Sequence, residues 1–251
     1  MIDKNLSSRF CNIEFSITHR ADLFSRKEHE LKCIATVNAQ FIVLANTNKR
    51  YMDYINSHDA TFDGEIPLKV AKKMCAVFKD AEKLAGSEIV YDFARYAKEN
   101  GLKMFFLGGR ADSNAGAVQK IHNDYGVEIE GFSPSFENYP FSEGFISSCC
   151  EKISDFKPDI LFVGFGAPKQ EFFIEDNFDF LKSCGVKYAV GSGGTFEFVS
   201  GKIARAPKWV QRAGLESLFR FFNEITWMRF KRILYSFRFY KYINKKPEFA
   251  I

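Results

Sequence analysis

Short apolar runs alternate along the chain with segments in which apolar residues recur every three or four positions. The runs contain many β-branched and aromatic residues, which is typical of strands that are covered on both faces of a parallel sheet. The segments with helical spacing predict the helices that connect those strands. This alternation predicts an α/β fold with a mostly parallel sheet flanked by helices. We expect strands near residues 34–38, 60–63, 103–107, 127–129, 160–163 and 188–190, and helices near 39–56, from 65 onward, 90–100, 113–125, up to 156, and 170–181.

From about residue 206 the pattern becomes purely helical, which predicts a core over residues 1–200 and a helical appendage over 201–251. The net charge of +4 conceals an asymmetry, because residues 202–247 contain twelve Lys or Arg and only two Glu. The appendage is also rich in aromatic residues. A basic, aromatic helix favours an anionic surface, either phosphate or membrane. The alternative is an amphipathic helix that packs on the core or on another subunit.

The remaining composition indicates a folded globular protein of the reducing cytosol rather than a secreted or membrane-spanning protein. Hydrophobic residues make up 46% of the 251 positions, which is enough to fill a large core. The six cysteines have neither zinc spacing nor the density of a disulfide framework, so we expect reduced thiols and no metal site. We find no secretory signal and no apolar stretch of about 18 residues that could span a bilayer.

The segment FVGFGAPKQEFFI, residues 162–174, reads as a buried strand that ends in a glycine-rich turn. Gly164 and Gly166 allow the turn to bend without side-chain obstruction. Polar side chains directly after a parallel strand lie at the sheet edge where α/β proteins bind ligands, which makes Gln170 a candidate binding residue. An ordinary connection with Lys169 and Glu171 as a solvated pair is the open alternative.

Two further groups have the chemistry of a binding site. Gly193, Gly194 and Thr195 follow the strand near 188–190, where backbone N–H groups can hold a nucleotide phosphate or ribose. A tight turn without a ligand is the alternative. Thr36 and Asn38 lie two positions apart on one strand, so both side chains point to one face and can bond the same ligand. The alternative is that the next loop satisfies them.

Four separated stretches, in this order, carry a resemblance to a known family. They are ATVNAQFIVLA, TFDGEIPL, FVGFGAPKQE, and GSGGTFEFVSGKIARAPKW followed by GLESLFR. Together the chain from about residue 34 to 232 resembles the WecG/TagA/CpsF family of bacterial glycosyltransferases, glycosyltransferase family 26. Two positions depart from the family pattern, because Glu88 and Glu197 stand where aspartate is usual.

The resemblance implies a Rossmann-like enzyme that moves an N-acetylmannosamine-type sugar from UDP to a polyprenyl-diphosphate-linked GlcNAc. It implies inversion at the anomeric carbon and no metal or other cofactor, the UDP-sugar being a substrate. It places the enzyme in the cytoplasm, with the basic C-terminal helices at the inner face of the cell membrane, in surface polysaccharide or teichoic acid synthesis. An alternative is the same reaction with UDP-glucose or UDP-ManNAcA as donor, in exopolysaccharide or enterobacterial common antigen synthesis. Self-association into a homo-oligomer is also open.

The resemblance also implies roles for individual residues. Asp63 matches the aspartate proposed as general base, which takes the proton of the acceptor hydroxyl. From its position alone, helix capping is the favoured interpretation of Asp63. Gln170 is expected to bind sugar hydroxyls or the uracil edge. With no Asp-x-Asp motif in a suitable loop, side-chain cations or oriented N–H groups must neutralise the charge on the departing UDP. The expected substrate-binding residues are Thr36, Asn38, Lys83, Gln170, Gly193, Gly194, Thr195, Arg205, Arg212 and Arg220.

Two other classes of function compete with this interpretation. A dinucleotide-dependent oxidoreductase would use the same kind of sheet, but neither glycine turn has the GxGxxG spacing. A peripheral membrane scaffold or nucleic-acid-binding module would use the basic tail. That class leaves Thr36, Asn38, Asp63 and Gln170 without a shared task, and we therefore expect no nucleic-acid partner.

Overall fold

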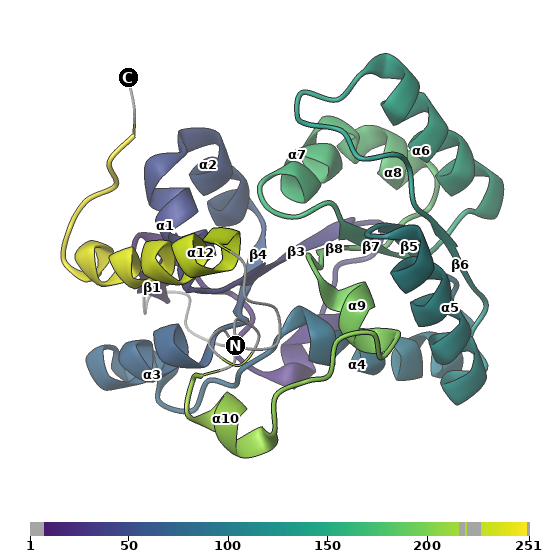
Figure 1. Ribbon diagram of the computed structural model, residues 1–251. Helices are drawn as coiled ribbons and strands as arrows, with labels where there is room; N and C mark the ends of the chain where they lie inside the picture. The colour runs from purple at the N-terminus through teal and green to yellow at the C-terminus, as the bar shows by residue number, and fades with distance from the viewer. Residues whose placement is uncertain (1–7, 216–218, 220–226, 250–251) are drawn as a thin grey trace. The chain divides into compact units, whose positions relative to one another are not determined.

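The computed structural model describes residues 8–215, 219 and 227–249, and it confirms the α/β fold (Figure 1). Six strands form one sheet in the order β4-β3-β8-β7-β5-β6. The chain divides into two compact units. The central unit comprises Arg26–Ala35 and Gly86–Ala204, and the terminal unit comprises the chain up to Ser25, Thr36–Ala85 and the chain from Arg205 onward. Strand β3 (Lys32–Val37) begins in the central unit and ends in the terminal unit.

The central unit is a parallel sheet with helices on both faces. Its strands β5, β6, β7 and β8 and the start of β3 pair in parallel. Helices α4, α5 and α9 lie together on one face, and α6, α7 and α8 lie on the other (Figure 1). The bounds are α4 Gly86–Asn100, β5 Met104–Gly108, α5 Ala111–Tyr125, β6 Ile129–Phe132, α6 Glu143–Phe156, β7 Ile160–Gly164, α7 Lys169–Asp176, α8 Phe178–Ser183, β8 Tyr188–Gly191 and α9 Thr195–Val199.

Aromatic side chains fill the space between this sheet and its helices. The ring of Phe162 on β7 meets Phe93 of α4 edge-on at 5.5 Å and Phe106 of β5 at 5.7 Å. Phe106 in turn stacks on Phe196 of α9 at 4.7 Å. Each of these rings is at most 1% exposed, and each contributes roughly 2 to 3 kcal/mol through burial alone. This packing fixes the strand ends that carry the two glycine turns.

The terminal unit surrounds the end of β3 and β4. Phe62 of β4 stacks on Phe15 with ring centroids 3.8 Å apart and meets Phe78 edge-on at 5.3 Å. The bounds are β1 Arg9–Phe10, β2 Ile13–Glu14, a 3₁₀ helix at Arg20–Phe24, α1 Ala39–Thr47, α2 Lys49–Ser57, β4 Asp59–Phe62, α3 Glu65–Met74, a 3₁₀ helix at Ala76–Phe78, α10 Lys208–Arg212, α12 Trp227–Phe237 and a 3₁₀ helix at Arg238–Ile243.

The C-terminal segment packs within the terminal unit. Helix α12 and the 3₁₀ helix after it contact α1, and Phe239 and Tyr242 are buried. The Asn12 side chain donates to the Lys245 carbonyl at 2.9 Å, and the Glu248 N–H donates to the Asn46 carbonyl at 2.8 Å. This segment is therefore tied to both the first strands and the first helix of its unit.

Most predicted elements are present, with differences in their extent. The helix expected over 39–56 is two helices that meet at Asn48, and the one expected over 170–181 is two helices that meet at Asn177. Helix α4 begins at Gly86, four residues earlier than expected, and β6 lies two residues later. The short helix α9 was not predicted.

Candidate functional site

The predicted site residues fall into two groups, each within one compact unit. The first group combines polar residues at the ends of β3 and β4 with cations from later segments, and the second group follows the ends of β7 and β8. Arg220 lies outside the described residues. The terminal unit contains Thr36, Asn38, Asp63, Lys83, Arg205 and Arg212, and the central unit contains Gln170, Gly193, Gly194 and Thr195.

Asn38 and Asp63 come together at the ends of neighbouring strands. The Asp63 N–H donates to the Val37 carbonyl at 3.0 Å, which holds the two chain segments side by side. The Asn38 oxygen accepts from the N–H groups of Gln40 and Phe41 at 3.0 and 3.2 Å and so caps α1. Its amide nitrogen then faces the Asp63 carboxylate, at 3.4 Å from Oδ2. The cap thus fixes a donor beside the predicted general base.

The turn after Asp63 brings α3 close to the same point. Helix α3 begins at Glu65 with Gly64 as its N-cap residue, so Asp63 lies one position before the cap. A Cβ atom at Gly64 would lie 3.5 Å from the Asn38 Cα atom. Asp63 is half-buried, and Thr36, the other polar side chain of this strand end, is 4% exposed. The Asp63 carboxylate is therefore partly shielded from water.

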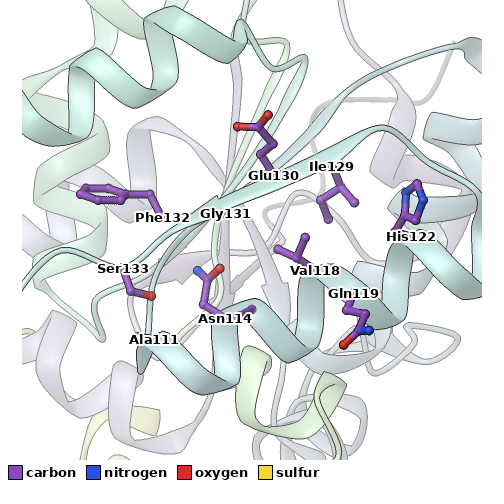
Figure 2. A pocket seen from close by; sticks show the side chains of 11 residues that line it. Ala111, Asn114, Val118, Gln119, His122, Ile129, Glu130, Gly131, Phe132 and Ser133 are labelled. Carbon is purple, nitrogen blue, oxygen red and sulfur yellow. The ribbon is translucent and has the colours of Figure 1, made fainter.

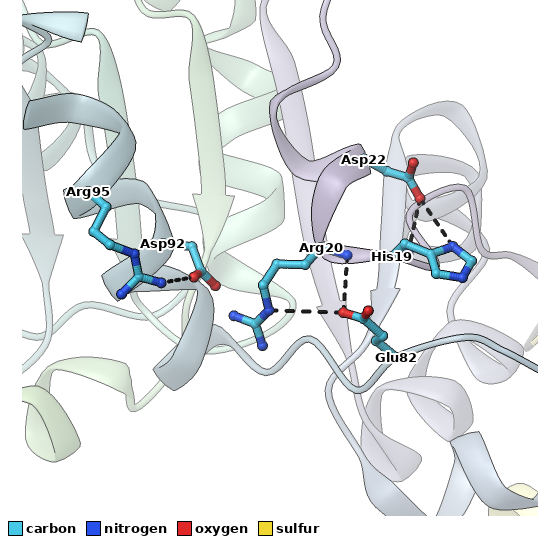
Figure 3. A network of polar contacts seen from close by, with 6 residues as sticks. All are labelled: His19, Arg20, Asp22, Glu82, Asp92 and Arg95. Atoms are coloured by element: carbon cyan, nitrogen blue, oxygen red, sulfur yellow. Dashed lines mark hydrogen bonds and ion pairs between the residues drawn. The ribbon is translucent and has the colours of Figure 1, made fainter. Parts of the chain in front are cut away.

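Lys83 lies on a segment that is held at both ends. On one side Arg20 contacts Glu82, through its N–H at 3.2 Å and its Nε at 3.9 Å from the same carboxylate oxygen (Figure 3). On the other side the Leu84 N–H donates to the Phe62 carbonyl at 2.8 Å. Phe62 is the last residue of β4, directly before the aspartate. Half-buried Lys83 is therefore a cation close in the structure to the end of that strand.

The basic segment after residue 204 is attached to α3. The Lys69 ammonium on α3 donates to the Arg212 carbonyl at the end of α10. Gly214 has φ of +76°, and a Cβ atom there would lie 2.6 Å from Ile66 Cγ1, so only glycine fits this approach. Arg205 is half-buried and the Arg212 side chain is exposed. Two predicted arginines are thus carried by a segment that rests on the helix following the Asp–Gly turn.

In the central unit Gln170 joins the two glycine turns. Its side-chain oxygen accepts from the Gly166 N–H at 3.1 Å and from the Gly193 N–H at 2.9 Å. Gln170 is 0% exposed, although it lies in the polar KQE triplet. Because β7 and β8 are neighbouring parallel strands, these turns lie at the same edge of the sheet. A ligand that takes the Gly193 N–H would displace the Gln170 oxygen.

Glu171 is buried beside Gln170. Its Oε1 accepts from the Gln170 amide nitrogen at 2.8 Å, and its Oε2, also buried, has no hydrogen-bond partner within the described part of the chain. Burial raises the pKa of this carboxyl to about 7, and the hydrogen bond from Gln170 only partly opposes the shift. A Cβ atom at Gly191 would lie 2.8 Å from both side chains, so β8 must present a glycine here.

The alternative that Lys169 and Glu171 form a solvated pair is wrong. The Lys169 ammonium donates to the Glu137 carbonyl at 2.9 Å and lies 4.1 Å from the centre of the Phe136 ring. Burial lowers the pKa of Lys169. Glu171, at 1% exposure, points into the protein instead. Because Glu171 is a polar residue, the sequence does not predict its burial. The apolar residues FFI that follow it are the feature that could have indicated a buried position.

The GSGGT turn is fixed to β7 as well as to β8. Both the N–H and the hydroxyl of Ser192 donate to the Val163 carbonyl, at 2.9 and 3.1 Å. The Thr195 hydroxyl donates to the Ser192 carbonyl at 2.7 Å, and Thr195 is 3% exposed. Gly193 has φ of +52°, and Gly194 precedes α9 as its N-cap residue. These hydrogen bonds hold the turn against the ends of both strands.

A pocket of about 610 Å³ lies elsewhere in the central unit, between α5 and the edge strand β6 (Figure 2). It contains none of the predicted site residues. Asn114 lines this pocket, but its amide nitrogen already donates hydrogen bonds to the backbone carbonyls of Phe106 and Gly108, at 2.8 and 2.9 Å. Gly131 also lines it, and a Cβ atom there would collide with Asn114. We place no step of the function in this pocket.

Two searches of the described residues concern cofactors and membranes. Within residues 8–215, 219 and 227–249, no three His, Cys, Asp or Glu side chains gather as metal ligands. In the same part of the chain, none of the helices combines the length and the apolar character that crossing a bilayer requires.

The parallel sheet flanked by helices, with glycine turns tied together at the ends of adjacent strands, makes this protein an α/β protein, a class in which ligands commonly bind at the carboxyl edge of the sheet. The model of the glycosyl transferase WecG/TagA/CpsF family matches residues 8–247, so the chain belongs to this family and is a glycosyltransferase.

Two curated bacterial proteins are similar over most of the chain. One, from Bacillus subtilis (strain 168), is 27% identical over 200 residues, which are 78% of this chain and 73% of the relative. The other, from Bacillus spizizenii (strain ATCC 23059 / NRRL B-14472 / W23), is 28% identical over 201 residues, with the same shares. Both are named N-acetylglucosaminyldiphosphoundecaprenol N-acetyl-beta-D-mannosaminyltransferase.

Proposed function

We propose that this glycosyltransferase moves an N-acetylmannosamine-type sugar from UDP to a polyprenyl-diphosphate-linked GlcNAc, with inversion and without a metal ion or other cofactor. The names of the two Bacillus relatives support the acceptor and the sugar. The observation that carries the proposal is the Asn38–Asp63 pair, because it holds a half-buried carboxylate beside a fixed amide donor at the ends of two parallel strands. UDP-glucose and UDP-ManNAcA are the alternative donors.

In this mechanism Asp63 takes the proton of the acceptor hydroxyl as its oxygen attacks the anomeric carbon. The bond to UDP breaks on the opposite face of the sugar, which inverts the configuration. The Asn38 amide orients the carboxylate, and Thr36 lines the same strand end. Negative charge develops on the departing diphosphate and requires nearby cations. We assign that role to Lys83, Arg205, Arg212 and Arg220.

The donor nucleotide is assigned to the glycine turns of the central unit. Gly193, Gly194 and Thr195 lie directly after the parallel strand β8, at the edge of the sheet where α/β proteins bind ligands. Because the N–H groups of Gly193 and Thr195 already donate to the Gln170 oxygen and the Ser192 carbonyl, we assign contact with the nucleotide to the shape of this turn and to its Gly194 backbone. Gln170 acts at this site through the turns that it joins. We therefore expect UDP to protect these two turns when it binds.

The enzyme works at the inner face of the cytoplasmic membrane, where its lipid-linked acceptor lies, in the synthesis of a bacterial surface polysaccharide or teichoic acid. Leu234, Phe237 and Tyr240 are 54%, 52% and 47% exposed and recur at helical spacing. The basic side chains of Lys231 and Arg238 are exposed on the same segment. An apolar row flanked by cations suits the surface of an anionic bilayer, at about 1 kcal/mol for each basic residue.

A donor panel tests the reaction. UDP-ManNAc, UDP-ManNAcA and UDP-glucose are each supplied with a short-chain polyprenyl-diphosphate-GlcNAc, and the product is identified by mass and by the anomeric coupling in NMR. We expect transfer from UDP-ManNAc with inversion. Asp63→Asn should lower kcat by about 10²- to 10⁴-fold. It should change the free energy of unfolding by less than about 1 kcal/mol, since asparagine has the same shape and keeps an oxygen that can accept from Asn38. A fully active Asp63→Asn enzyme would remove Asp63 from the mechanism.

A vesicle assay tests the membrane surface separately. Replacing Leu234, Phe237 and Tyr240 with Ser should reduce co-sedimentation with phosphatidylglycerol vesicles without unfolding the protein, because all three side chains are exposed. Phe136→Ser is the matched control, since Phe136 is 82% exposed but lies in the central unit. Equal loss of binding in both variants would show that this surface is not the docking site.

A further inference from the structure

The orientation of the Gln170 amide is set by the backbone around it. The N–H groups of Gly166 and Gly193 can only donate, so the Gln170 oxygen must face them, at 3.1 and 2.9 Å. The amide NH₂ is then forced to the other side, where the side chain is fully buried and water cannot serve it. A buried donor without an acceptor is costly, so this arrangement depends on what lies on that side.

The acceptor on that side is Glu171. Its Oε1 takes the hydrogen bond from the Gln170 NH₂ at 2.8 Å, and Glu171 is itself only 1% exposed. The two residues are adjacent at the start of α7, and Gly191 of β8 leaves the space that both side chains occupy. We propose that Glu171 is a positioning residue of the donor site, which acts as a hydrogen-bond acceptor that holds Gln170 in the orientation joining the two glycine turns.

The consequence for the reaction rests on the proposed function, in which these turns bind UDP. Gly166 follows β7 and Gly193 follows β8, and the single Gln170 oxygen sets the separation between them. Without Glu171 the buried NH₂ of Gln170 has no acceptor while its oxygen faces the two N–H groups. The cost of this buried donor weakens the anchor that the two turns share. The donor site then has to be ordered by the nucleotide itself, which weakens both binding and turnover.

Two variants of Glu171 distinguish a role as hydrogen-bond acceptor from a role of its negative charge. Glu171→Gln keeps a carbonyl oxygen at the same reach, so it still accepts from Gln170 and keeps the turns joined. Glu171→Leu keeps the bulk but removes the acceptor. A role for the carboxylate charge, in contact with substrate or as a base, would make both variants equally inactive. The neutral form that burial favours at this site fits the acceptor role.

The test compares these variants in the full-length enzyme. We measure kcat and KM for transfer, UDP affinity by calorimetry, and hydrogen exchange of peptides containing the Gly166 and Gly193 amides. Glu171→Leu should lower kcat/KM by about tenfold or more and speed exchange at both glycines. Glu171→Gln should stay within about threefold of the wild type in both readouts. Asp179→Asn, an exposed carboxylate-to-amide change in the same unit, is the matched control and should change neither.

A double variant shows whether Glu171 acts through Gln170. Gln170→Leu should speed exchange at both glycines, and Gln170→Leu/Glu171→Leu should be no worse, because the second change removes an acceptor that no longer has a donor. Additive losses would overturn the proposal, as would an inactive Glu171→Gln or normal exchange in Glu171→Leu. If Glu171→Leu does not fold, the Glu171→Gln result still decides between acceptor and charge.

Failure of the proposed function gives a different result. In that case the wild type transfers no sugar from any UDP donor, while the hydrogen-exchange comparison still reports whether Glu171 keeps Gln170 and the two turns joined.

Discussion

Asn38→Asp is the change that examines the Asn38–Asp63 pair most directly. The new carboxylate can still accept from the N–H groups of Gln40 and Phe41, so the cap of α1 is kept. The amide that faces Asp63, however, is replaced by a second negative charge at the same place. The variant therefore changes the electrostatics around the predicted base while leaving the local fold intact.

The size of the effect follows from the 3.4 Å that separate Asn38 Nδ2 from Asp63 Oδ2. Two unit charges about 4 Å apart interact by about 1 kcal/mol in bulk water and about 4 kcal/mol at an effective dielectric constant of 20. A half-buried pair lies between these limits. Because 1.36 kcal/mol corresponds to one pH unit, the acid limb of the kcat/KM profile should move to higher pH by about 1 to 3 units.

The assay is the pH dependence of kcat/KM for sugar transfer in the wild type, Asn38→Asp and Asn48→Asp. Asn48 is the matched control, because it caps α2 in the same unit by accepting from the Tyr51 N–H at 3.0 Å. The control should keep the wild-type profile. Unfolding of Asn38→Asp at pH 5, where the pair can share one proton, should differ from the wild type by less than about 1 kcal/mol.

An unshifted profile in Asn38→Asp would refute the reasoning, because it would mean that the group titrating in the acid limb is not beside Asn38. An equal shift in Asn48→Asp would show a general effect of charge at helix caps rather than a local effect on Asp63.

Three further predictions concern other parts of the molecule. Burial raises the pKa of Glu171 in the folded protein from 4.5 to about 7, so the folded state loses stability as the pH rises from about 4.5 to 7. Glu171→Gln should remove up to about 3 kcal/mol of this pH dependence, measured by urea unfolding at pH 5 and 8. An unchanged dependence would contradict the burial argument. Gly214→Ala should destabilise the protein by about 1 to 3 kcal/mol in thermal unfolding, because the φ of +76° and the close Ile66 side chain disfavour a Cβ atom at this position. An unchanged stability would show that the Ile66 side chain moves aside at little cost. Transfer should continue in EDTA, and loss of activity that Mg²⁺ restores would refute the metal-independent mechanism.

The fold was predictable because its central strands are buried on both faces. The runs near Phe105 and Phe162 are continuously apolar, so they could be assigned to strands from the sequence. The helix breaks were not predictable from the same pattern, because apolar spacing continues through them. At Asn48 the side chain caps the next helix, and at Asn177 the side chain donates back to the Phe173 carbonyl at 2.8 Å. Such breaks depend on single polar side chains, which hydrophobic periodicity does not register.

The site was predictable in its parts but not in its contacts. The positions of Asn38 and Asp63 at strand ends could be inferred, but their contact depends on β3 and β4 being neighbours in the sheet. The order of strands is decided by packing of whole elements, so local residue patterns carry little information about it. The close approach of Gly64 to Asn38, the residue that caps α1, also depends on β3 and β4 being neighbours.

Gln170 and Glu171 illustrate the harder case, in which polarity alone points the wrong way. A polar triplet after a glycine turn favours a solvated loop, yet two of its three side chains are buried. Burial is tolerated because the Gln170 oxygen and nitrogen both have partners and because Gly191 leaves room for the side chains. Oε2 of Glu171, which has no hydrogen-bond partner among the residues that the structure describes, belongs to a carboxyl whose pKa burial raises to about 7. The cost of desolvating a charge is thereby avoided over the acidic range, and the acceptor that Gln170 needs is kept.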